Sequence, residues 1–166
     1  MGAGGSTVDT GVMGLTERHR DVVNRVVQKT IDTDPAMVEA IARGAAKATL
    51  YAQTNPDCTR QIHWKTSPSA KPTGADDATL VKRDLALLQT SLDSMKSAQD
   101  MNGGKFIGAM DPAAYGRMQD FMLKEGLIKR TLPPESMLYL KPGFMEAVNR
   151  FDRTAVIDAA KACKGL

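Results

Sequence analysis

The sequence predicts a mainly α-helical fold with few or no strands, and three observations point to it. Apolar residues recur at spacings of three and four, which is the period of one helix face. An Asp or Asn directly before Pro occurs at Asp34-Pro35, Asn55-Pro56 and Asp111-Pro112. This pair is typical of a helix start, because the side chain accepts a backbone N–H and Pro lacks one. Gly103 and Gly126 follow periodic segments, as glycines do at helix ends.

Composition indicates one globular domain. The chain has 166 residues, of which 42% are hydrophobic and 25% charged. The net charge of +3 is spread along the chain and aromatics make up 5%, which argues against a nucleic-acid partner. No apolar run approaches the roughly 18 residues of a membrane-spanning helix. Residues 1–11 begin with a Gly/Ser-rich stretch that has neither the basic start nor the apolar core of a signal peptide, and they predict a flexible leader before a helical domain at 12–166.

The first third of the domain predicts two helices. The short apolar run 12–16 is compatible with a strand or a helix lead-in, and Thr16 is the expected cap of a valine-rich helix that ends near Asp32. The second helix spans 34–55, and its small residues from Gly44 to Ala48 predict close packing against another element. Its expected buried stripe consists of Met37, Ile41, Ala45, Ala48 and Ala52.

The middle of the chain predicts a short helix, a loop and a long helix. Asn55 begins the short helix, which carries Cys58, Ile62 and Trp64, and the Pro-rich segment 66–75 is an expected exposed loop. Asp76 or Asp77 caps the long helix, whose periodicity lasts about two heptads and therefore favours ordinary core packing over a coiled coil. Its expected buried stripe is Val81, Leu85, Leu88, Leu92 and Met95.

The last third predicts two more helices around an irregular segment. A helix from Asp111 to Gly126 is expected to bury Met118, Phe121 and Met122. Pro133 and Pro134 exclude a central strand in the segment that follows, since they donate no ladder hydrogen bond. A final helix runs from Asp152 to Gly165 and presents Val156, Ile157 and Ala160 to the core.

No catalytic or metal-binding motif stands out. His19 and His63 have no partner at a metal-ligand spacing, and no Ser lies in a GxSxG turn. The sequence therefore predicts neither an enzyme nor a cofactor. Trp64, the single Trp, is expected to pack over a helix junction rather than to grip a ligand.

The two cysteines, Cys58 and Cys163, leave two alternatives open. They are either free buried thiols or a disulfide closing a loop of about 105 residues, which the chain-entropy model values at up to roughly 4 kcal/mol.

Several motifs, taken in order and spacing, resemble the C-terminal part of periplasmic solute-binding proteins of the nitrate, taurine and aliphatic-sulfonate uptake type, whose fold is shared with thiamine-precursor proteins. The resemblance covers about residues 12–164. It is carried by Asp34-Pro35, Val38, Ile41, Arg43-Gly44, Ala46-Lys47-Ala48, Tyr51-Ala52, Asn55-Pro56-Asp57, His63-Trp64, Asp111-Pro112, Met118, Asp120-Phe121, Gly126-Leu127-Ile128 and Pro133.

The resemblance implies the helix-rich C-terminal portion of a two-lobed α/β fold of type II, which captures a small anionic or organic solute for an ABC importer. The implied partners are the solute, the importer membrane subunits, and the missing N-terminal lobe or a second copy. Gly5, Ser6 and Thr7 are the implied ligand-binding positions. A periplasmic location would favour the disulfide between Cys58 and Cys163. The alternative function is a free-standing helical protein-interaction or dimerisation domain.

Overall fold

The computed structural model describes residues 28–101 and 103–165, and every regular element in these ranges is a helix. The predicted mainly α class is therefore confirmed. The predicted leader 1–11, the apolar run 12–16 and most of the valine-rich helix lie outside the described residues. The helices are α1 (Gln28–Thr33), α2 (Pro35–Thr54), α3 (Pro56–Thr66), α4 (Asp77–Met101), α5 (Pro112–Lys124), α6 (Phe144–Val148) and α7 (Arg153–Lys161), with 3-10 turns η2 (Pro68–Ala70) and η3 (Pro134–Ser136). None of the described helices is long and apolar enough to cross a membrane.

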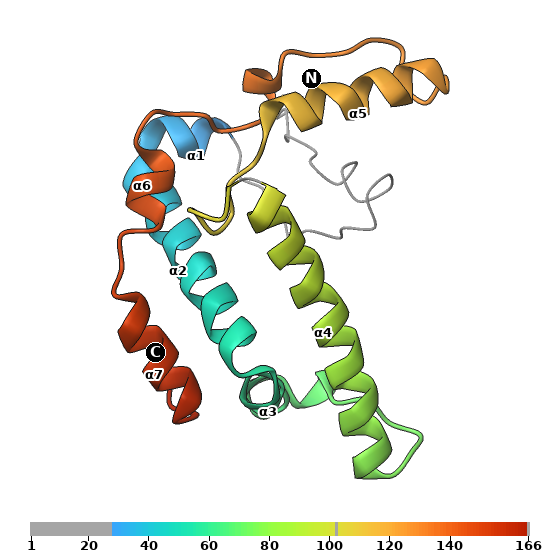
Figure 1. Cartoon of the computed structure of the whole chain (residues 1–166), viewed down its shortest axis with the longest axis vertical. Coiled ribbons are helices and arrows are strands. Elements are labelled where there is room, and N and C mark those ends of the chain that lie inside the picture. The colour runs from blue at the N-terminus through green and yellow to red at the C-terminus, as the bar shows by residue number, and fades with distance from the viewer. Residues whose placement is uncertain (1–27, 102, 166) are drawn as a thin grey trace, which may run out of the picture.

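Helix α2 is the centre of the arrangement (Figure 1). Helices α6 and α7 pack along α2, although they come from the other end of the chain. Helix α3 turns away at the C-terminal end of α2 and contacts α4, while α5 lies across the opposite end of the molecule. The chain therefore brings its last described helices back against α2.

The predicted helix starts are confirmed. Asp34, Asn55 and Asp111 each accept a backbone N–H two or three residues further on, at 2.9–3.1 Å, and each precedes a Pro. Asp76 is the residue that caps α4, since it accepts the N–H of Thr79 at 3.0 Å. These starts depend only on residues close in sequence, which is why the sequence predicts them well.

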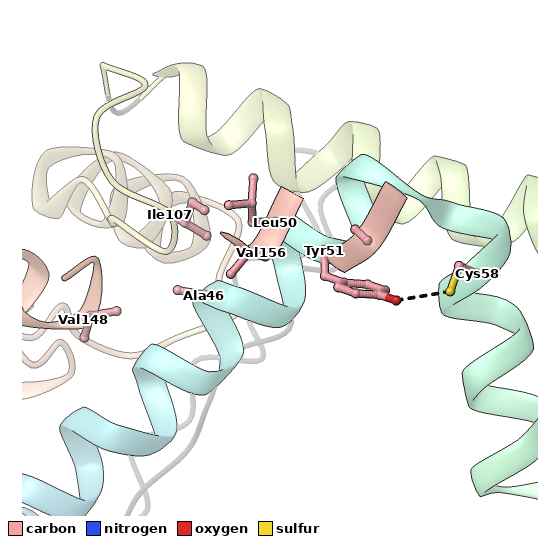
Figure 2. Close-up of a cluster of buried hydrophobic side chains, with 8 residues drawn as sticks. Ala46, Leu50, Tyr51, Cys58, Ile107, Val148 and Val156 are labelled. Atoms are coloured by element: carbon pink, nitrogen blue, oxygen red, sulfur yellow. Dashed lines mark hydrogen bonds between the residues drawn. The ribbon is translucent and has the colours of Figure 1, made fainter. Parts of the chain in front are cut away.

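The core forms where α2 meets α6, α7 and the link at 107 (Figure 2). Helix α2 contributes an alanine, a leucine and a tyrosine, and α6, α7 and the link contribute two valines, an alanine and an isoleucine. The core residues are Ala46, Leu50, Tyr51, Cys58, Ile107, Val148, Val156 and Ala160. Only Cys58 and Ala160 among them are more than 98% buried.

The predicted buried stripe of α2 is correct at Ala52, which is 8% exposed, but wrong over the first part of the helix. Met37 and Ile41 are 43% and 56% exposed, and Ala48 is exposed as well. The buried side of α2 instead contains Val38 and Ala46. The reason is that α6 and α7 pack against the side of α2 that carries Ala46, Leu50 and Tyr51, and this contact decides which side is buried.

The expected close packing from Gly44 to Ala48 occurs only at Ala46. Gly44 is exposed, and no described atom lies within 4 Å of the place where a Cβ would be. Ala46 is 4% exposed and belongs to the core. Gly44 therefore weakens the intrinsic stability of the helix by about 1 kcal/mol without a packing gain from the described residues.

The predicted end of the last helix at Gly165 is also wrong, because α7 stops at Lys161. Cys163 has a left-handed φ of +50°, and its N–H bonds to the Ala160 carbonyl at 3.0 Å. The N–H of Lys164 reaches the Ala159 carbonyl at 2.9 Å, which completes a Schellman ending. Cys163 thus occupies the position that a glycine usually takes.

Helices α4 and α5 agree with the sequence to different degrees. The predicted stripe of α4 is at least half-buried throughout, and Leu92 is 5% exposed. In α5, Met118 is buried as predicted, but Phe121 is 47% exposed. Gln119 is buried in its place, because its side-chain amide pairs with the backbone N–H and carbonyl of Leu132 at 2.7 and 2.9 Å. This pairing turns the α5 face toward the segment before η3.

Candidate functional site

The candidate site is a shallow cavity of about 260 Å³ between α3 and α4. Its wall combines two leucines with hydroxyl, imidazole, guanidinium and carboxylate groups. The lining residues are Thr59, Arg60, His63, Asp84, Leu87, Leu88 and Ser91. A cavity of this size is slightly smaller than a drug-sized ligand pocket and can take a small molecule or one apolar side chain.

Trp64 connects α3 to α4 beside the cavity, in a region that we call the α3–α4 corner. Its indole N–H donates to Asp84 Oδ2 at 2.7 Å, which ties α3 to α4. The Arg60 guanidinium and the Lys71 ammonium lie 4.4 and 5.2 Å from the ring centre, within cation–π range. The expected position of Trp64 over a helix junction is confirmed. Lys71, in the predicted loop 66–75, is half-buried beside this ring.

The two cations of this corner are both paired. Arg60 is 9% exposed and donates through Nε and Nη2 to Asp57 Oδ1 at 2.9 and 2.7 Å. Lys71 Nζ lies 2.9 Å from Asp77. The hydrogen bond from Arg60 has the largest effect on the pKa of Asp57, which it lowers, and the hydrogen bond from Gln61 lowers this pKa further. The corner therefore offers polar contacts without a net excess of positive charge.

Replacing Asp57 with Asn should lower the free energy of unfolding at pH 7 by about 1 kcal/mol, the low end for a charged bond because Asp57 is half exposed. The pKa of Asp57 is lower in the folded chain than its usual 3.8. Its contribution is therefore complete above that value and is lost as the pH falls through the folded pKa. Urea unfolding at pH 7 and pH 3 should show a smaller gap between wild type and Asp57→Asn at pH 3. An equal gap at both pH values would contradict this role.

The polar groups that line the cavity are engaged mainly within their own segments. The hydroxyls of Thr59 and Ser91 bond to carbonyls of their own helices, so neither is aimed at a base. His63 is exposed and forms no hydrogen bond to another described side chain. In the described ranges no three His, Cys, Asp or Glu side chains come together as metal ligands would.

The predicted site residues have different outcomes. Gly5, Ser6 and Thr7 lie outside the described residues. Cys58 and Cys163 are joined by a disulfide, so neither is a free thiol. The Tyr51 hydroxyl lies 3.1 Å from Cys58 Sγ and donates to the Lys164 carbonyl at 2.9 Å, which places it beside the bridge (Figure 2).

Some contacts of the site cannot be predicted from the sequence. The Asp57–Arg60 pair has a helical spacing of three that can be read directly. Asp84 is twenty residues from Trp64, and nothing in the sequence pattern links the two.

Comparison of the chain with protein-family models, curated proteins and solved structures finds no match.

Proposed function

We propose that this chain is the helix-rich portion of a periplasmic solute-binding protein that serves an ABC importer for a small anionic or organic solute. The two-lobed fold, the solute and the importer subunits all belong to this proposal. It starts from the motifs that resemble the nitrate, taurine and aliphatic-sulfonate group, and three of these motifs, at Asp34, Asn55 and Asp111, are helix caps in the structure.

The exposed apolar side of α2 carries the proposal. Met37 and Ile41 are one helical turn apart and remain 43% and 56% exposed. Large apolar residues that share a helix face are usually covered by another element. In a two-lobed receptor, the other lobe would provide that cover. The failed prediction of the α2 stripe therefore becomes an argument for a partner surface.

The disulfide supports the proposed location. Disulfides persist in oxidising compartments such as the periplasm and are rare in the cytosol of mesophiles. The bridge joins the start of α3 to the end of the chain after α7. It holds together the two segments that pack on α2.

Two measurements test the proposal. Cell fractionation should find the protein in the periplasm with Cys58 and Cys163 unreactive toward a thiol-alkylating agent before reduction. Thermal-shift screening should find a solute among taurine, alkanesulfonates, nitrate and pyrimidine precursors that raises the melting temperature, because a ligand that binds only the folded state stabilises it. A cytosolic, reduced protein that responds to none of these solutes would overturn the proposal.

A second candidate function is homotypic pairing through α4. Leu87 lies at the rim of the cavity between α3 and α4 and is 69% exposed. Two antiparallel copies of α4 centred near Leu88 would bring Arg83 of each copy beside Asp93 of the other, a self-complementary arrangement. Light scattering during size-exclusion chromatography should then show a dimer that Leu87→Asp disrupts. A monomer at high concentration would exclude this function.

A further inference from the structure

An apolar tip lies at the free end of α5. Figure 1 shows α5 with its C-terminal end pointing away from the other described helices and the chain then returning alongside it. Phe121, Leu123 and Leu127 are 47%, 42% and 63% exposed. Phe121 and Leu123 are two residues apart and therefore lie on different sides of the helix, so the end of α5 is apolar on more than one side.

The tip is an ordered turn. Gly126 adopts a left-handed φ of +71°, which lets the chain reverse after α5. The N–H of Leu127 then bonds to the Met122 carbonyl at 2.8 Å. The bonds between Gln119 and the Leu132 backbone anchor the returning segment to α5. The apolar side chains are therefore presented on a fixed support and not on a free loop.

Between residues 120 and 130, exposed cations outnumber exposed carboxylates, which are those of Asp120 and Glu125. Lys124, Lys129 and Arg130 are all exposed, and none of them takes part in an ion pair among the described residues. Elsewhere, Lys71 and Lys96 are paired with carboxylates. We define the α5 tip as Phe121, Leu123, Lys124, Leu127, Lys129 and Arg130.

We propose that the α5 tip binds the surface of an anionic membrane. Phe121, Leu123 and Leu127 would enter the boundary between headgroups and acyl chains, and the three cations would contact lipid phosphates. Unpaired cations beside exposed Phe and Leu complement such a surface in both charge and polarity. The position at the end of a projecting helix lets the tip reach a plane without the rest of the protein. This inference does not depend on the proposed solute.

Vesicle co-sedimentation tests the proposal with the whole chain. The protein should pellet with vesicles of phosphatidylglycerol and phosphatidylcholine, and added salt should weaken the binding because it screens the charges. Phosphatidylcholine alone should bind at least tenfold less protein. The pairs Phe121→Ser with Leu127→Ser, and Lys129→Glu with Arg130→Glu, should each reduce binding about tenfold.

Matched controls lie away from the α5 tip. Leu140→Ser removes an apolar side chain that is 43% exposed, and Arg153→Glu with Lys161→Glu reverses two exposed cations of α7. These variants should bind like wild type, and circular dichroism should show that every variant is folded. Equal loss in these control variants, equal binding to phosphatidylcholine, or binding only to vesicles that contain membrane proteins would overturn the proposal.

Discussion

Replacing Cys163 with Ser should lower the free energy of unfolding by about 4 kcal/mol, because the disulfide with Cys58 closes a long loop and restricts the unfolded chain. The two cysteines are 105 residues apart. Cys163 is exposed whereas Cys58 is 1% exposed, so Ser at position 163 removes the bridge without creating a cavity. The effect is therefore attributable to the loss of the cross-link.

Urea unfolding followed by the fluorescence of Trp64, the single Trp, measures this change. Dithiothreitol should lower the stability of the wild type to that of Cys163→Ser and should leave the variant unchanged. A wild type that is indifferent to the reductant, or a variant that loses stability with it, would contradict the assigned role of the bridge.

The starts of the helices could be predicted because each depends on a few neighbouring residues. Asp34, Asn55 and Asp111 cap their helices through backbone N–H groups within three residues, and the following Pro excludes an earlier start. The end of α7 depends on more than its neighbours. Gly165 satisfies the local rule for a helix stop, but the chain reverses at Cys163, which a bridge to α3 holds in place.

The buried faces were harder to predict than the helices. On α2, two stripes have the same spacing, and α6 and α7 decide which one is buried. The periodicity of α2 contains no information about which of its sides those helices contact. On α5, a buried Gln119 displaces Phe121 from the interior because the Leu132 backbone needs a partner. This pairing spans thirteen residues and has no local signal.

In the candidate site, too, local features could be predicted and contacts between distant residues could not. The Asp57–Arg60 pair follows from its helical spacing, and Trp64 was expected at a junction. The contact between Trp64 and Asp84 requires α3 and α4 to meet after an irregular connection that contains η2. The sequence could therefore predict which residues are notable, but not which of them come together.

Asn55 should be among the most sensitive positions in the chain, because one side chain performs two tasks. Its Oδ1 accepts the N–H of Cys58 at 3.0 Å and caps α3, while its Nδ2 donates to the Ala160 carbonyl near the end of α7 at 2.9 Å. Asn55→Ala should lower the free energy of unfolding by about 2 kcal/mol, the sum of a lost cap and a lost hydrogen bond to the Ala160 carbonyl, which keeps its bond from the N–H of Cys163.

Asn55→Ser separates the two tasks, because Ser caps a helix about as well as Asn but is too short to reach Ala160. Its cost should be about 1 kcal/mol, the value of the Ala160 bond alone. Asp34→Ala provides the matched control, since Asp34 caps α2 and has no second partner among the described residues, and it should cost about 1 kcal/mol. Urea unfolding measures all three variants. Equal losses for Asn55→Ser and Asn55→Ala would show that the cap contributes nothing to stability. If Asn55→Ser is as stable as the wild type, the contact with α7 contributes nothing.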